Sequence, residues 1–225
     1  MEISTLPELF KSTFPFWGAM RDEDKNMFLR SAQTAIFKKG TTVHDGNECT
    51  GVILIKTGAL RMYLLSDDGK EVTLCRLFPG DTCIFTASCA LDSITFDVSV
   101  DAEEDSECMI IGGCAYEEVV RKLPEAKIYT YESALSRFSD VMWAMQQILF
   151  MSMDKRLAIF LLDESANSGS DTVKLTHEQI AKYMGSAREV VSRMLKYFAS
   201  EGLISSSRTE GIKLLDKKRL RELTR

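Results

Sequence analysis

The segment that decides the fold is residues 175–198, LTHEQIAKYMG (175–185) followed directly by SAREVVSRMLKYF (186–198). Thr176 and Gln179 match the capping box, in which a hydroxyl residue and an acid or amide three positions later satisfy the free amide groups of a helix start. Ser186 and Glu189 repeat this pattern ten residues later. Two helix starts so close together, with Gly185 at the turn, predict a helix-turn-helix.

The exposed start of the second predicted helix carries side chains suited to reading bases. Arginine can donate two hydrogen bonds to guanine, glutamate accepts from the cytosine amino group, and serine can reach a base or a phosphate. Thr176 and His177 begin the first helix, where a phosphate is favoured. The candidate DNA-binding residues are therefore Arg188, Glu189, Ser192, Arg193, Thr176, His177 and Ser186. The alternative interpretation of these charges is an ordinary solvated helix face.

A β-hairpin is predicted directly after this module. Gly202 provides a helix C-cap, and residues 205–215 show the pattern of two short strands, typical of the wing of a winged helix. Arg208 and Lys213 would then be placed to touch phosphates. Ordinary surface charges explain these two residues equally well.

A long helix is predicted from about Glu125 to Met153, with no Gly or Pro between Pro124 and Met153. Its apolar residues alternate at spacings of three and four, which is a heptad pattern suited to a partner helix. We expect dimerisation through Ile128, Tyr131, Leu135, Phe138, Met142, Met145 and Leu149. The remaining apolar residues Val141, Ile148 and Phe150 predict a second face packed on the chain's own domain. The alternative is a core helix of a monomer.

The region before this helix has the pattern of an all-β domain. Short apolar segments alternate with turns rich in Gly and Asp at intervals of about ten residues, which predicts a sandwich or barrel with room for a small ligand. The segments are 52–55, 59–65, 72–78, 96–100 and 108–111. Residues 1–36 are expected to be partly helical around a small aromatic core at 14–17, and residues 114–123 to form a short helix. Residues 154–165 predict another helix, and residues 166–171 a polar loop.

Composition places the chain among intracellular globular proteins, and we expect a cytoplasmic protein without a membrane-spanning segment. Its net charge of −5 is unevenly distributed. From Ser152 onward there are 14 Lys and Arg against 10 Asp and Glu, whereas the first 151 residues hold 14 against 23. A basic C-terminal part favours a polyanionic partner. The six cysteines form no CxxC pattern, so we expect free thiols.

Three motifs resemble those of the CRP/FNR family of bacterial transcription regulators: Phe78–Asp81 (FPGD), Lys155–Ala158 (KRLA) and Leu175–Ile204. The resemblance covers nearly the whole chain. It implies an α+β fold with an N-terminal β-roll (cyclic-nucleotide-binding-like, similar to a cupin jelly roll), a long dimerisation helix and a C-terminal winged helix-turn-helix. The expected domains are residues 1–124, 125–153 and 154–225. The resemblance further implies a homodimer that binds a near-palindromic double-stranded DNA operator and contacts RNA polymerase.

The sequence departs from the family at its known effector sites. Members that bind cyclic nucleotides carry Gly-Glu after the Pro-Gly-Asp turn and then an Arg with a small hydroxyl residue, but here Thr82 follows Asp81 and Ile94 aligns with the Arg. Residues 77–120 contain no Lys, Arg or His and ten Asp and Glu, which would leave a buried phosphate uncompensated. Cyclic AMP is therefore not the expected effector. The iron–sulfur cluster of the FNR subgroup is not expected either, because no cysteine precedes Cys49.

Three other sensing routes remain open, and the effector itself stays unknown. Cys83 and Cys89 flank the expected pocket and could sense oxidants, although buried inert thiols are favoured. Haem could use His44 or a cysteine, but is not favoured. A small apolar or aromatic ligand is the third route. The candidate pocket residues are Cys83, Phe85, Cys89, Phe96 and Tyr131, with Trp143 nearby.

A different class of function is an enzyme or small-ligand-binding module built on a cupin-like β-barrel. Metal-dependent cupins place several His and a Glu on their strands, whereas this predicted β domain has His44 alone, so no metal site is expected. No Ser–His–Asp or phosphate-loop pattern is present. The regulator interpretation is preferred and an enzyme is not expected.

Overall fold

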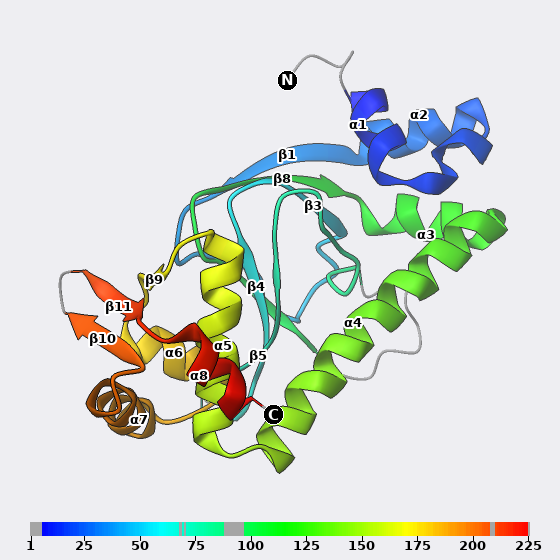
Figure 1. Cartoon of the computed structure of the whole chain (residues 1–225). Coiled ribbons are helices and arrows are strands. Elements are labelled where there is room, and N and C mark those ends of the chain that lie inside the picture. The colour runs from blue at the N-terminus through cyan, green and yellow to red at the C-terminus, as the bar shows by residue number, and fades with distance from the viewer. Residues whose placement is uncertain (1–5, 68, 70, 88–96, 208–209, 225) are drawn as a thin grey trace. The chain divides into compact units, whose positions relative to one another are not determined.

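The computed structural model describes residues 6–67, 69, 71–87, 97–207 and 210–224. The chain forms two compact units, Met1–Leu65 with Leu74–Val141 (the N-terminal unit) and Ser66–Thr73 with Met142–Arg225 (the C-terminal unit). Figure 1 shows the elements of both units along the chain.

The N-terminal unit begins with three short helical elements that enclose aromatic side chains. They are α1 (Leu6–Thr13), the 3-10 helix η2 (Pro15–Ala19) and α2 (Asp22–Ser31). Phe10, Phe14, Phe16 and Phe28 are buried and meet edge-to-face or tilted, with ring centroids 5.3 to 6.5 Å apart. Such arrangements match the positive edge of one ring to the negative face of another. The predicted aromatic core is confirmed and is larger than the sequence pattern indicated.

Two four-stranded sheets form the β domain of this unit. The first has the order β1-β8-β3-β6 and the second the order β2-β7-β4-β5. β8 is the centre of the first sheet, since Ala32 of β1 and Val52 of β3 both pair with Ile111. The strands are β1 (Ala32–Phe37), β2 (Thr42–His44), β3 (Val52–Thr57), β4 (Leu60–Leu65), β5 (Glu71–Leu77), β6 (Thr82–Cys83), β7 (Ser99–Ala102) and β8 (Ser106–Ile111).

The strand predictions are confirmed for β3, β4, β5 and β8, whereas β7 shares only residues 99–100 with its predicted segment and continues to Ala102. Phe96, where that segment begins, lies outside the described residues. β1 was missed because its residues are mostly half-exposed or exposed and so lack an apolar pattern. Gly51 shows why a glycine precedes β3: its φ is +99°, and a Cβ there would lie 2.2 Å from the Ile111 carbonyl oxygen.

Two helices follow the sheets, α3 (Gly113–Lys122) and the long α4 (Pro124–Phe150). The short helix predicted at 114–123 is confirmed. The long helix is confirmed with Pro124 as its first residue, but it ends at Phe150 and Ser152 already caps the next helix. Val141 packs on the core of the β domain as expected. The expectation for its two companions is wrong, because Ile148 is 40% and Phe150 81% exposed.

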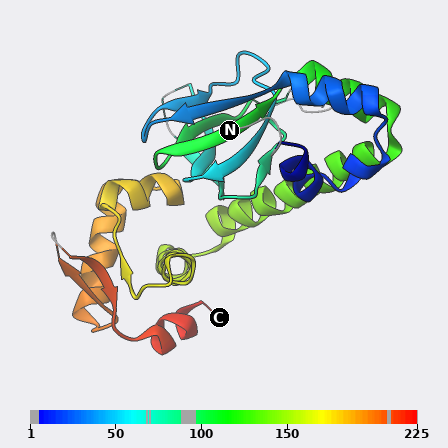
Figure 2. The same cartoon turned by 90° about the horizontal axis from the view of Figure 1, so that it is seen from above.

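Besides Ser66–Thr73 and the end of α4, the described part of the C-terminal unit contains four helices and a small sheet of order β10-β11-β9. Figure 2 shows α7 and the β10–β11 hairpin next to each other in this unit. The elements are α5 (Met153–Ser168), β9 (Thr172–Val173), α6 (His177–Met184), α7 (Arg188–Ser200), β10 (Ile204–Ser207), β11 (Gly211–Leu214) and α8 (Lys217–Leu223). The predicted hairpin is confirmed. α5 extends three residues beyond its predicted end, so the predicted loop at 166–171 begins as helix.

Candidate nucleic-acid interface

Packing in the C-terminal unit determines which face of each helix remains free. α6 buries Ile180, Ala181 and Met184, whereas α7 buries Val191, Leu195 and Phe198. The α7 residues recur at spacings of four and three, which is one face of a helix. The opposite face of α7 is consequently exposed and polar.

The start of α6 is fixed by the predicted capping box. The Gln179 amide donates to Thr176 Oγ1 at 3.1 Å, and the Thr176 amide donates to Gln179 Oε1 at 2.8 Å. Gly185 then ends α6 with a left-handed φ of +56°, a conformation that glycine adopts without steric cost. The first predicted capping box and the turn glycine are both confirmed.

The second predicted capping box is wrong. Ala187, not Ser186, is the N-cap of α7, and it makes no side-chain cap hydrogen bond. The Ser186 hydroxyl instead contacts Met153 Sδ at 3.9 Å. The turn between the helices is one residue longer than the pattern indicated, so the hydroxyl at position 186 precedes the cap.

The predicted base-reading residues do lie on the free side of α7. Arg188, Glu189 and Arg193 are exposed and Ser192 is half-buried. The Ser192 hydroxyl lies 3.3 Å from His177 Nδ1, so the first residue of α6 touches the reading helix. Thr176 uses its hydroxyl as a cap and is otherwise exposed.

A groove of ≈ 770 Å³ runs between the start of α6, one side of α7 and the hairpin. We call it the reading groove; residues that line it include Lys174, His177, Arg188, Ser192, Lys196 and Ser206. Lys196 and Lys174 were missed by the sequence interpretation. Lys196 could have been predicted from its spacing, because it lies four residues after Ser192 and eight after Arg188 on the same helix face.

Electrostatics in the reading groove favour an anion. Arg188, Lys174 and Lys196 line it with Glu178 and Glu210. Burial first, and then the charges of Arg188 and Lys196, hold the pKa of His177 below its ordinary value. Of the two predicted wing contacts, Lys213 is exposed on β11 and Arg208 lies outside the described residues.

The seven residues predicted to dimerise are all exposed in the single chain, with relative exposures from 46% to 65%. They lie on α4 at the heptad spacing, and we call them the α4 stripe. Large apolar side chains gathered in this way favour a protein partner.

Of the candidate effector-pocket residues that the structure describes, Tyr131 does not lie with Cys83 and Phe85. Cys83 is buried and Phe85 packs against both cores of the N-terminal unit. Tyr131 lies on the exposed α4 stripe instead, with the Lys127 ammonium 5.7 Å from its ring centroid. Cys89 and Phe96 lie outside the described residues. Trp143, proposed as a neighbour, is also exposed.

Three thiols of the N-terminal unit, those of Cys75, Cys83 and Cys108, are held in their protonated form. Burial raises the pKa of Cys75 to about 12 and that of Cys108 to about 11, and it raises the pKa of Cys83 as well. A protonated thiol is a poor nucleophile. Cys49 and Cys114 are exposed.

Arginine side chains do reach the β domain from outside the cation-free window at 77–120. Arg137 of α4 lies 3.3 Å from Asp81 and 3.3 Å from Asp140. Arg61 of β4 lies 3.4 Å from Asp101. Arg137 could not be found from residues 77–120 because it lies outside that window along the chain and reaches Asp81 from α4. These arginines already face carboxylates.

His44, the candidate haem ligand, is buried, and its Nδ1 lies 2.8 Å from the Thr50 hydroxyl. Within the described part of the chain, no group of three or more His, Cys, Asp and Glu could hold a metal ion. Among the same residues, no helix is both long enough and apolar enough to cross a membrane.

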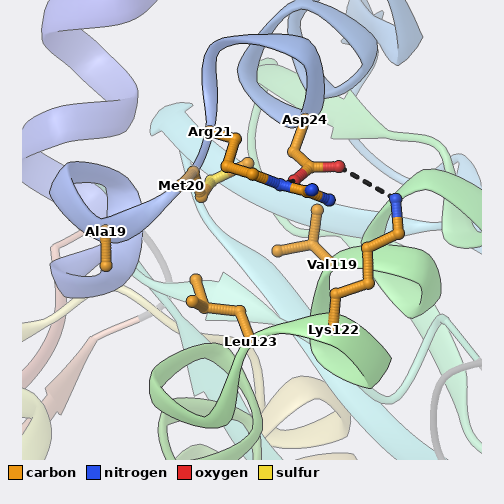
Figure 3. Close-up of a pocket in the computed structure, with 7 residues that line it drawn as sticks. All are labelled: Ala19, Met20, Arg21, Asp24, Val119, Lys122 and Leu123. Atoms are coloured by element: carbon orange, nitrogen blue, oxygen red, sulfur yellow. Dashed lines mark hydrogen bonds and ion pairs between the residues drawn. The ribbon is translucent and has the colours of Figure 1, made fainter.

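Figure 3 shows a second pocket, of ≈ 400 Å³, between η2, the start of α2 and the end of α3. Lys122 Nζ donates to Asp24 Oδ1 at 3.0 Å and Arg21 Nε to Asp24 Oδ2 at 3.1 Å. The Lys122 bond is the main cause of the lowered pKa of Asp24. Because its charges satisfy one another, this pocket joins α2 to α3 and has the character of a structural site.

Comparison with known proteins agrees with this geometry. Residues 155–223 match the family model of a Crp-like helix-turn-helix domain, and residues 35–122 match that of a cyclic nucleotide-binding domain. A crystal structure described as a transcriptional regulator of the CRP/FNR family from Eubacterium rectale is 45% identical, covers 95% of this chain and 99% of its own, and has a TM-score of 0.89.

Two curated relatives are more distant. The cyclic AMP receptor protein of Thermus thermophilus is 24% identical over 84% of this chain and 88% of its own length. The transcriptional activator protein anr of Pseudomonas aeruginosa is 25% identical over 80% of this chain and 75% of its own length.

A winged helix-turn-helix joined to a β domain of the cyclic-nucleotide-binding type defines a DNA-binding transcription regulator. The chain belongs to the CRP/FNR family. The α+β fold implied by the sequence motifs is confirmed.

Proposed function

We propose that the protein acts as a homodimer that binds a near-palindromic DNA operator and contacts RNA polymerase. The observation that carries the dimer is the α4 stripe, whose seven large apolar side chains are exposed in the single chain. A helix with this spacing pairs with an identical helix in a parallel coiled coil. Two-fold symmetry would then place the two α7 helices in successive major grooves about 34 Å apart.

We further propose that the β domain senses a small effector other than cyclic AMP. The family's Gly-Glu and Arg motifs are missing, and among the described residues Arg61 and Arg76 of the β domain and Arg137 of α4 already face carboxylates. A cyclic phosphate would have to compete with those carboxylates for a cation. The raised thiol pKa values also favour a diffusible ligand over thiol oxidation.

Regulation would follow from a difference in effector affinity between two dimer geometries. An effector that binds one geometry more tightly shifts the population toward it, and only that difference can drive the change. In one geometry the two α7 helices match the operator spacing, and in the other they do not. The homodimer is therefore the element on which both the effector and DNA act.

The test combines DNA selection with a measurement of assembly. The full chain would be used to select from random DNA duplexes, and its mass in solution measured by analytical ultracentrifugation. We expect a dimer and two inverted half-sites about 10 base pairs apart, centre to centre. A monomer that selects one isolated half-site would contradict the proposal.

The effector requires a separate experiment. Absorption spectra and intact mass of protein purified without oxygen would reveal a bound prosthetic group such as haem. A colourless protein of the calculated mass supports a diffusible effector, which would then be sought by screening small molecules for a change in operator affinity. Visible absorption bands would contradict a diffusible effector as the sole signal.

A further inference from the structure

The contact between His177 and Ser192 gives the reading helix a titratable neighbour. His177 is the first residue of α6, and its Nδ1 lies 3.3 Å from the Ser192 hydroxyl. Ser192 lies one turn after Arg188 and one turn before Lys196, and all of them line the reading groove. The imidazole therefore touches a side chain that faces the place where a base would lie.

The direction of this hydrogen bond depends on the protonation of His177. In a neutral imidazole whose proton is on Nε2, Nδ1 can only accept, so the serine hydroxyl donates its single proton to it. The remaining lone pairs of Ser192 then face the groove. In the imidazolium both ring nitrogens donate, so Ser192 accepts from His177 and its own proton is free to point into the groove.

We propose that His177 is a positioning residue that sets the hydrogen-bond polarity of Ser192, and that protonation of His177 reverses it. With neutral His177 carrying its proton on Nε2, Ser192 accepts, which suits the amino groups of adenine and cytosine in the major groove. With charged His177, Ser192 donates, which suits guanine O6 and N7 or thymine O4. The inference rests on the proposed reading of DNA by α7.

Charges around His177 decide whether its imidazole is neutral or protonated in the protein without DNA. The groove brings Arg188 and Lys196 of α7, Lys174 before α6, Glu178 of α6 and Glu210 of the hairpin to its surroundings. Arg188, Lys196 and partial burial disfavour the imidazolium. In the neutral ring with its proton on Nε2, Ser192 is then an acceptor toward the groove. A DNA phosphate near the start of α6 would add negative charge and favour the imidazolium.

The first experiment tests the contact without DNA. The full chain has only two histidines, so its imidazole ¹⁵N spectrum contains two rings, and the His177→Asn variant assigns them. We expect Ser192→Ala to change the ring tautomer ratio and the pKa of His177. Ser206→Ala is the matched control, because that hydroxyl lines the same groove. An unchanged His177 ring in Ser192→Ala would overturn the proposal.

The second experiment measures base preference. The full chain would select from random duplexes at about pH 8 and about pH 5.5, on the two sides of the ordinary histidine pKa. The position that Ser192 reads is the one whose preference disappears in Ser192→Ala. There we expect the ratio of affinities to move about fivefold from amino-bearing toward carbonyl-bearing bases as the pH falls.

Two variants separate positioning from a general structural role. His177→Asn keeps a hydrogen-bonding group near Ser192 but does not titrate, so its base preference should be the same at both pH values. His177→Phe replaces the imidazole with an aromatic ring that makes no hydrogen bond to Ser192, and it should lose the base preference at that position at both pH values. An identical pH shift in His177→Asn would overturn the role of His177. Failure of the wild-type chain to select any sequence would instead overturn the DNA-reading function.

Discussion

The two units of this protein place their polar chemistry in opposite ways. In the C-terminal unit, Arg188, Glu189 and Arg193 point outward from one side of one helix. In the N-terminal unit, the arginines of the β domain are turned toward carboxylates of other elements, as with Arg61 and Asp101. A polyanion needs accessible cations, whereas a small ligand needs a protected space. This difference favours DNA reading by the C-terminal unit and ligand sensing by the N-terminal unit.

The largest effect is expected from a substitution in the α4 stripe, because operator binding depends on the dimer that the stripe would form. Leu135→Glu would bury a charge in the dimer interface, which costs about 3 kcal/mol or more per dimer. We expect a monomer in analytical ultracentrifugation and loss of operator binding, because each half-site alone is weak. Ser136→Glu adds the same charge one residue away, off the stripe, and should remain a dimer. A dimeric Leu135→Glu variant would contradict the role of the stripe.

A smaller effect is expected when the reading side of α7 is changed. Arg193→Ala removes an exposed guanidinium, and we expect operator affinity to fall by about 1–3 kcal/mol while the dimer and the fold persist. Lys218→Ala removes an exposed positive charge of the same unit from α8 and serves as the control. Fluorescence anisotropy with a selected operator measures both. Equal losses in the two variants would indicate non-specific charge instead of base reading.

The same contrast explains how far the sequence alone could lead. The helix-turn-helix is encoded locally: Thr176, Gln179 and Gly185 lie within ten residues, and each acts on its near neighbours. In the β domain, residues that contact each other are distant along the chain, for example Arg137 and Asp81, or Cys83 and Ile53. A pattern of neighbouring residues carries no information on such pairings, so the strands were predicted but the surroundings of the sensing region were not.

Two features of the reading site were not predicted, each for a different reason. Ser186 and Glu189 fit the capping pattern, but the chain leaves Gly185 in a turn one residue longer, and Ala187 becomes the cap. The contact between His177 and Ser192 joins two helices, so its residues are fifteen apart and no spacing rule connects them. Both residues were predicted to meet DNA, but their contact with each other was not.

Substitutions at the N-caps of α6 and α7 are expected to change the free energy of unfolding by intermediate amounts and in opposite directions. Thr176→Ala removes the hydroxyl that accepts from the Gln179 amide and should lower the free energy of unfolding of the C-terminal unit by about 1 kcal/mol. Ala187→Ser supplies the missing hydroxyl at the start of α7 and should raise it by about 0.5–1 kcal/mol. Urea denaturation followed by circular dichroism measures both. A destabilised Ala187→Ser variant would show that Ala187 is not a suitable cap position.

The smallest expected effect is a dependence of stability on pH that involves both units. Burial is the main cause that lowers the pKa of His44 in the N-terminal unit and of His177 in the C-terminal unit. A lowered pKa means that the unfolded chain binds the proton more readily. The free energy of unfolding is then fully present above the ordinary histidine pKa of 6.5 and falls as the pH drops through the folded values.

Single substitutions would divide this effect between the two units. His177→Asn should reduce the loss of stability on acidification for the C-terminal unit, and His44→Asn for the N-terminal unit, as followed by hydrogen exchange at about pH 7 and about pH 5.5. The Asp24 carboxylate, whose pKa is lowered chiefly by its bond to Lys122, adds a further loss only below its ordinary value of 3.8. Because that window lies lower, Asp24 does not contribute to the loss near pH 6. Equal acid sensitivity in wild type and both variants would exclude them as the cause.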